Sequence, residues 1–250
     1  MKSTIDSANQ NLLQLMRNIY PGRGIVVGVD ETGKYIFHVY WIMGRSPNSR
    51  NRIFITGEEG EIKTDAADPS KVEDPSLIIY TAMFGNGSSS CHAVSNGHQT
   101  KDARLYGNIE HGLLTPTFTK AWKYEPDAPI YTSRVQAISF RNHGDVRHEM
   151  SIMRKSPFSD ACHMSYHSLP DIAPGYGCCI HAYKGDGDPP PAFVGEPYFL
   201  PFVGSMENVG QMIWDALDEN NRVALAVKSI RIDTGEIATH IINKYEKVLA

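Results

Sequence analysis

Three arginines, Arg45, Arg50 and Arg52, stand within eight residues directly after an apolar run that ends at Met43. Small hydrogen-bonding residues lie between them, namely Ser46, Asn48, Ser49 and Asn51. Such a stretch is typical of a solvated surface loop. The alternative is a phosphate or carboxylate site, because planar guanidinium groups bind these anions through two parallel hydrogen bonds. The stretch alone does not decide between the two interpretations.

Cysteines and histidines of the second half of the chain form another candidate for chemistry. They are Cys162, His163, Cys178, Cys179 and His181. Zinc sites usually contain ligand pairs two to four residues apart, and none of these spacings appears twice here. We therefore interpret residues 178–183 as a buried strand whose thiols act as small apolar side chains, and we expect no metal and no cofactor.

The composition bounds the class of protein. The chain has 250 residues, of which 41% are hydrophobic and 21% charged, with a net charge of −4. This length suffices for a two-layer core, and we expect a single domain over residues 1–250. The acidic balance argues against nucleic-acid binding. No apolar stretch approaches the roughly 18 residues of a membrane span, and the first twenty residues do not resemble a signal peptide, so we expect a cytoplasmic protein.

Hydrophobic periodicity and turn residues predict the elements that must position these side chains. The predicted helices cover residues 6–18 and 205–221, with weaker helical signals between 100 and 122. The predicted strands and hairpins cover residues 20–42, 52–64, 76–97, 133–140, 149–154, 178–183 and 222–246. Residues 165–177 and 185–197 are rich in Pro and Gly and are predicted to be irregular loops. Sequential hairpins interrupted by helices favour an α+β fold with antiparallel sheets covered by helices.

Five segments, in this order, carry a resemblance to a known family. They are YPGRGIVVG (20–28), YWIMGRSPNSRNR (40–52), SLIIYTAMF (76–84), VSNGHQTKD (94–102) and YEPDAPIYTSR (124–134). Together they resemble the archaeal-type IMP cyclohydrolases and their bacterial relatives, over roughly the first 140 residues. The resemblance implies an N-terminal-nucleophile-hydrolase-like fold, in which two stacked antiparallel β-sheets are flanked by helices (αββα), but without an N-terminal nucleophile.

The implied reaction belongs to de novo purine biosynthesis. The ring of 5-formamidoimidazole-4-carboxamide ribonucleotide closes to give IMP and water. The resemblance assigns catalytic positions to Tyr80, Glu125 and Arg52, with Tyr80 donating to the formyl oxygen and Glu125 accepting the amide proton or orienting the amide. Taken without the family, Tyr80 is typical of a core tyrosine and Glu125 of an exposed turn carboxylate.

A larger set of residues is expected to bind the substrate. It consists of Arg23, Arg45, Ser46, Asn48, Arg50, Asn96, Gly97, His98 and Arg134. Arg50 and Arg52 compete for one role, because the loop is longer here than in the family pattern. The expected partner is a small ribonucleotide, with no nucleic acid and no membrane, and self-association is left open. Two alternatives also remain open: an amide or nucleotide hydrolase of the same fold, and a non-catalytic purine-nucleotide-binding protein.

Overall fold

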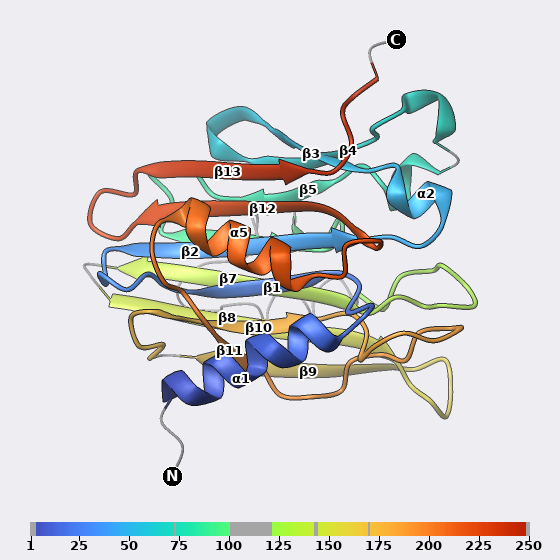
Figure 1. The fold of residues 1–250 in the computed structure, drawn as a ribbon, viewed down its shortest axis with the longest axis horizontal. Coiled ribbons are helices and arrows are strands. Elements are labelled where there is room, and N and C mark those ends of the chain that lie inside the picture. Colours follow the sequence, from blue (N-terminus) through green and yellow to red (C-terminus); the bar gives the residue numbers. More distant parts are fainter. Residues whose placement is uncertain (1–3, 73, 101–121, 143–144, 170, 249–250) are drawn as a thin grey trace.

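The computed structural model describes residues 4–72, 74–100, 122–142, 145–169 and 171–248. Two antiparallel β-sheets are stacked on one another, and helices cover the outer face of one sheet (Figure 1). This confirms the prediction of an α+β fold with two stacked antiparallel sheets. The prediction of a single domain over 1–250 stays a prediction, and the helical signals between 101 and 121 lie outside the described residues.

The first sheet has six strands in the spatial order β11-β10-β1-β2-β12-β13. In chain order they are β1 (Gly24–Val29), β2 (Tyr35–Met43), β10 (Tyr176–His181), β11 (Tyr198–Pro201), β12 (Arg222–Arg231) and β13 (Ile237–Asn243). The β1–β2 and β12–β13 pairs are the predicted hairpins. Every residue of β1 is buried, because this central strand is covered on both faces.

The second sheet has seven strands that follow one another in chain order. They are β3 (Ile53–Thr56), β4 (Ile62–Asp65), β5 (Thr81–Phe84), β6 (Cys91–Ser95), β7 (Arg134–Asn142), β8 (Asp145–Lys155) and β9 (Cys162–Leu169). The side-chain amide of Asn243, on β13, donates to the Phe54 carbonyl at 2.9 Å and accepts from the Phe54 N–H at 2.8 Å. Asn243 thereby ties an edge of the first sheet to the second.

Helices α1 (Thr4–Arg17) and α5 (Met206–Ala216) lie across the outer face of the six-stranded sheet (Figure 1). The hydroxyl of Ser205 caps α5 by accepting from the Asn208 N–H, so the predicted helix begins where expected. Val209 and Ile213 are fully buried against this sheet. None of the described helices has the length and apolar character needed to cross a membrane.

The structure differs from the predicted elements in its short turns and in one edge strand. Residues 76–80 do not extend β5, because Pro75–Leu77 form a 3₁₀ turn (η3) in which the Asp74 carboxylate accepts from the Ser76 N–H at 2.8 Å. Two similar turns are η1 (Glu58–Gly60) and η2 (Pro69–Lys71). The predicted loop 165–177 is wrong at both ends, since β9 pairs with β8 as far as Leu169 and β10 pairs with β1 from Tyr176. The side chains of the edge strand β9 are mostly half-buried and show no apolar alternation, so the hydrophobic pattern did not reveal it.

A row of polar side chains interrupts the apolar core between the sheets. The Ser139 hydroxyl on β7 lies 2.6 Å from His38 Nε2 on β2 and 2.7 Å from His148 Nδ1 on β8. Burial lowers the pKa of His148 to about 4 and that of His38 well below its usual range, so both rings are neutral at pH 7. The other nitrogen of each ring is buried with no hydrogen-bond partner among the described residues.

Candidate active site

A cavity of about 240 Å³ opens at one end of the two sheets. Because neighbouring strands are antiparallel, the start of β1, the end of β2 and the end of β10 meet there, together with the loop that enters β7. Its lining includes Tyr20, Arg23, Arg45, Ser46, Asn48, Arg52, Glu125, Asp127, Thr132 and Tyr183. Five of the residues predicted for binding or catalysis, from two separate segments, thus line the same cavity as Glu125.

Glu125 is a buried carboxylate between two guanidinium groups. Arg23 Nη1 donates to Glu125 Oε2 at 2.9 Å, and Arg134 Nη1 lies 3.8 Å from Glu125 Oε1. All three side chains are largely shielded from solvent. Backbone pairing also fixes the carboxylate, since the Glu125 N–H donates to the Thr132 carbonyl at 2.8 Å. The prediction of an exposed turn carboxylate at this position does not describe the structure.

Arg134 is held by contacts on several sides. Its Nε donates to the Lys123 carbonyl at 2.9 Å, its Nη1 donates to Gln99 Oε1 at 2.9 Å, and the guanidinium lies 4.9 Å from the centre of the Trp122 ring. Gly97 leaves room for this arrangement, because a Cβ at that position would lie 2.3 Å from Arg134 Nη1. Arg134 therefore contacts Glu125 without being among the residues that line the cavity.

Arg52 adds a second buried cation to the cavity. Its Nε is shielded from solvent and has no hydrogen-bond partner among the described residues. Burial, and next the like charge of Arg23, lower the pKa of Arg52, while Tyr80 and Glu125 act in the opposite sense. These four groups therefore lie within electrostatic reach of one another. Glu125 is paired with Arg23 and Arg134. Arg52 is therefore an additional buried cation without an ion-pair partner of its own among the described residues, and this arrangement favours an anionic or highly polar ligand.

Tyr80 is joined to a tyrosine of the other sheet. Its hydroxyl oxygen lies 2.7 Å from that of Tyr40, which sits on β2, and both hydroxyls are buried. Burial raises the pKa of Tyr40 well above its usual range, so this hydroxyl keeps its proton. Tyr80 is not among the residues that line the 240 Å³ cavity; it lines a different cavity, of about 700 Å³. The tyrosine pair nevertheless stands beside the arginines and Glu125.

The three arginines of the arginine-rich loop differ in their positions relative to the cavity. Arg45 and Arg52 line the cavity, whereas Arg50 does not, and its Nε donates to the Gly44 carbonyl at 3.0 Å. Arg45 Nη1 donates to Asp186 Oδ1 at 2.5 Å, and the guanidinium lies over the Tyr20 ring. Within the loop, Pro47–Arg50 form the single helical turn α2, which the Ser46 hydroxyl caps.

Three further predicted residues lie behind the cavity lining. The Asn96 amide donates to the Ser133 carbonyl at 2.9 Å and accepts from the Val135 N–H at 2.8 Å, so it fixes the entry to β7. His98 contacts the Ser76 carbonyl through Nε2 at 2.8 Å, with its ring 6.0 Å from that of Tyr80. Asn96, Gly97 and His98 are not among the residues that line this cavity.

Sequence reasoning missed several residues of the site, among them Tyr40, Asp127, Thr132 and Tyr183. The Thr132 hydroxyl lies 2.6 Å from the Tyr183 hydroxyl and also contacts the Asp127 carboxylate. Burial raises the pKa of Asp127, and hydrogen bonds from Thr132 oppose this effect. The signal that could have found Tyr40 is the period of two along β2, which places its side chain on the face that meets the second sheet.

The cysteine and histidine residues are not gathered into one site. Among the described residues, no group of three or more His, Cys, Asp or Glu side chains is arranged to hold a metal ion. Cys178 and Cys179 are buried on β10, which confirms the interpretation of residues 178–183 as a buried strand up to His181. Burial raises the pKa of the Cys178 thiol to about 12, as in an unreactive core cysteine.

The comparisons with known proteins identified a family but no individual related protein. Neither the comparison with curated proteins nor the comparison with solved structures found a match. A model of the family described as IMP cyclohydrolase-like proteins matches residues 20–235. This range contains the whole cavity lining and both members of the tyrosine pair. The protein therefore belongs to the IMP cyclohydrolase-like family.

Proposed function

We propose that the protein is an IMP cyclohydrolase, which closes 5-formamidoimidazole-4-carboxamide ribonucleotide to IMP and water. The observation that carries the proposal is that proton-donating hydroxyls and fixed charges lie close together in one buried region. The Tyr40–Tyr80 hydroxyl pair supplies proton donors, and beside it the Arg23–Glu125 ion pair and Arg52 supply fixed charges. The family match supports the same activity.

The reaction requires one bond to form and one to break. The carboxamide nitrogen attacks the formyl carbon and loses a proton, while the formyl oxygen gains a proton and becomes a hydroxyl. The hydroxyl then leaves as water, taking one further proton, and the ring nitrogen that carried the formyl group loses its proton as the C=N bond forms. The amide is a weak nucleophile, so orientation and stabilisation of the formyl oxygen must lower the barrier.

In this mechanism the tyrosine pair serves the formyl oxygen. Tyr40 donates to the Tyr80 oxygen, and this leaves the Tyr80 proton free for the substrate. The same hydroxyl afterwards assists the departure of water. Arg52, which is buried within electrostatic reach of Tyr80, stabilises the negative charge that develops on the formyl oxygen.

Glu125 serves the other reacting group. Its carboxylate accepts a hydrogen bond from the carboxamide N–H₂ and takes the proton that the nitrogen loses. Arg23 and Arg134 fix both carboxylate oxygens, so the acceptor has one orientation before substrate arrives. Arg45, Ser46 and Asn48 line the part of the cavity formed by the arginine-rich loop, and we assign the phosphate and ribose to them.

The test is turnover of the formylated ribonucleotide, followed by ultraviolet absorbance, because ring closure changes the chromophore. We expect catalytic turnover by the wild-type protein and loss of turnover in Tyr80→Phe. Tyr35→Phe removes a hydroxyl from the opposite end of β2 and should retain activity. Stoichiometric binding without turnover would instead support a nucleotide-binding protein, and release of free formate would support an amide hydrolase.

A further inference from the structure

One wall of the candidate active site is formed by Asp127, Thr132 and Tyr183. Asp127 and Thr132 belong to the loop that enters β7, and Tyr183 follows the end of β10. All three line the cavity of about 240 Å³. None of them was predicted as a site residue, and none takes part in the proposed ring closure.

The hydrogen bonds among these three side chains run in one direction. The Thr132 N–H donates to Asp127 Oδ1 at 2.7 Å, and the Thr132 hydroxyl donates to Asp127 Oδ2. A threonine hydroxyl has one proton, so the Tyr183 hydroxyl, 2.6 Å from Thr132 Oγ1, must donate its own proton to Thr132. An ionised carboxylate has about four lone-pair sites, and Thr132 occupies only part of them. The wall therefore offers hydrogen-bond acceptors to a ligand and no donors.

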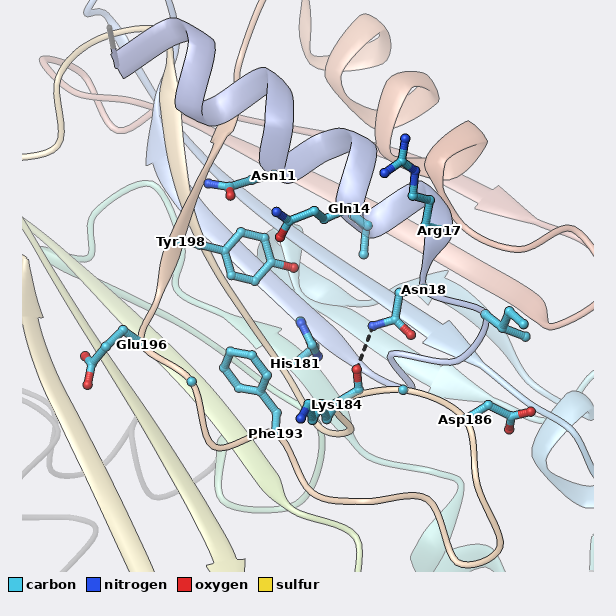
Figure 2. A pocket seen from close by; sticks show the side chains of 14 residues that line it. Asn11, Gln14, Arg17, Asn18, His181, Lys184, Asp186, Phe193, Glu196 and Tyr198 are labelled. Atoms are coloured by element: carbon cyan, nitrogen blue, oxygen red, sulfur yellow. Dashed lines mark hydrogen bonds between the residues drawn. The ribbon is translucent and has the colours of Figure 1, made fainter. Parts of the chain in front are cut away.

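Asp127 has no ion-pair partner among the described residues, although arginines line the same cavity. Arg23 pairs with Glu125 at 2.9 Å, and Arg45 pairs with Asp186 at 2.5 Å. Figure 2, a view of the neighbouring cavity, shows the Asp186 carboxylate pointing away from the other side chains labelled there. Burial raises the pKa of Asp127, but its hydrogen bonds and the charge of Arg23 oppose this rise and leave it ionised at neutral pH.

Tyr20 connects the acceptor wall to the arginine-rich loop. Its ring stacks on that of Tyr183, with ring centres 5.6 Å apart and planes inclined by 18°. The Arg45 guanidinium lies 4.6 Å from the centre of the same Tyr20 ring. Gly22 leaves room for the stack, because a Cβ at that position would lie 2.3 Å from Tyr183 Cδ2. The acceptors therefore lie next to the donors that we assign to the phosphate.

We propose that Asp127 and Tyr183 bind the 2′- and 3′-hydroxyls of the ribose and make the site selective for ribonucleotides. The inference rests on the proposed function, which places a ribose beside the arginine-rich loop. A cis-diol presents two adjacent O–H donors, which complement two adjacent acceptors, and carboxylates bind ribose hydroxyls in the same way in dinucleotide sites. A phosphate would be repelled by Asp127, and a cationic ligand would be repelled by the arginines.

The measurement is titration calorimetry with IMP and with 2′,3′-dideoxy-IMP, which lacks both hydroxyls. Asp127→Asn keeps the shape of the side chain but replaces an acceptor by an N–H₂ donor, and Tyr183→Phe keeps the ring that stacks on Tyr20. Asp30→Asn is the matched control. The Asp30 carboxylate also accepts from the N–H and the hydroxyl of a threonine, Thr32, but it lies in the β1–β2 turn and does not line the cavity.

We expect wild type and Asp30→Asn to bind IMP roughly 10- to 100-fold more tightly than the dideoxy nucleotide. Asp127→Asn should reduce this preference to about threefold or less, and Tyr183→Phe should reduce it by roughly two- to tenfold. Affinity for the dideoxy nucleotide should change little in either variant. Equal affinity of wild type for the two nucleotides would overturn the proposal, as would absence of IMP binding tighter than about 1 mM. An undiminished preference in Asp127→Asn would also overturn it, because a purely structural role of the carboxylate would weaken both ligands alike.

Turnover of the formylated ribonucleotide separates this inference from the proposed function. If IMP is preferred through Asp127 but the formylated ribonucleotide is not turned over, the ribose site stands and the proposed ring closure is wrong. If wild type closes the ring of the 2′,3′-dideoxy substrate with unchanged kcat/KM, the proposed function stands and the ribose site is wrong.

Discussion

The hydroxyl oxygens of Tyr40 and Tyr80 lie 2.7 Å apart, although the two residues come from different sheets. Tyr40 is on β2 of the six-stranded sheet, and Tyr80 directly precedes β5 of the seven-stranded sheet. A single hydrogen bond between two hydroxyls uses one proton and leaves the other free. The stacking of the sheets therefore produces a tyrosine with an available proton beside the buried arginines.

This relationship predicts unequal effects of removing the two hydroxyls. Tyr80→Phe removes the group that donates to substrate and should lower turnover by ~100- to 10,000-fold. Tyr40→Phe removes only a supporting hydrogen bond of ~0.5–1.5 kcal/mol, so turnover should fall by roughly tenfold or less. Both ring systems stay in place, and thermal unfolding should confirm that each variant folds. A larger loss in Tyr40→Phe than in Tyr80→Phe would reverse the assigned roles.

The arginine-rich loop offers a second test with an internal control. Arg52→Ala should lower turnover by roughly 10- to 150-fold, which corresponds to the ~1.5–3 kcal/mol typical of a hydrogen bond to a charged group, because Arg52 stabilises the charge that develops on the formyl oxygen. Arg50→Ala should change turnover by no more than ~0.5 kcal/mol in activation free energy, because Arg50 bonds to the Gly44 carbonyl outside the cavity. Turnover of the formylated ribonucleotide distinguishes the two. Equal effects of both substitutions would mean that the loop changes conformation when substrate binds.

The sequence could not decide which of Arg50 and Arg52 lines the cavity. Spacing placed both arginines near an anion site, but the turn α2 rotates Arg50 toward the backbone and leaves Arg52 at the start of β3. Tyr40 was missed for a related reason, because a tyrosine in an apolar strand is typical of a core residue. Its role depends on Tyr80, which meets it only through the stacking of the sheets.

The elements themselves were easier to predict than the site. Strong periodicity and turn residues gave the β1–β2 and β12–β13 hairpins and both long helices, because local chemistry decides those elements. The edge strand β9 was missed because its side chains show no apolar alternation, although it forms a hairpin with β8. Glu125 lies in a loop, and its carboxylate is enclosed by contacts with Arg23 and Arg134. Arg23 is distant from Glu125 in the chain, and Arg134 follows the loop, so the sequence alone did not indicate that Glu125 is buried.

Gly97 gives a test of the positions behind the cavity. In Gly97→Ala the new Cβ would lie 2.3 Å from Arg134 Nη1 and 2.7 Å from Gln99 Oε1, so the guanidinium must move away from Glu125. We expect turnover to fall by roughly 10- to 100-fold, as for the loss of a charged hydrogen bond, with a smaller change in the Michaelis constant. Gly185→Ala is the matched control, since its nearest contact would be an ordinary 3.6 Å from Asn18 Oδ1. Unchanged turnover in Gly97→Ala would show that Arg134 does not position Glu125.

The buried histidines predict how stability depends on pH. Burial lowers the pKa of His148 and of His181 to about 4 and that of His92 to about 3, all below the ordinary value near 6.5. Between pH ~6.5 and ~4 the unfolded chain therefore binds more protons than the folded protein. The free energy of unfolding must fall as the pH is lowered through this window, by up to ~1.4 kcal/mol per pH unit for each histidine.

His148 is the residue with which to test that slope. His148→Asn keeps a polar group near Ser139 but cannot be protonated, so urea unfolding at pH 5, 6 and 7 should show a shallower loss of stability than in wild type. Met150→Leu lies two residues further along β8 and is also fully buried, so it should shift stability by a similar amount at every pH. If His148→Asn and wild type lost stability in parallel between pH 7 and 5, protonation of the histidine row would not be what destabilises the protein in acid. Acid unfolding would then have to arise from the carboxylates instead.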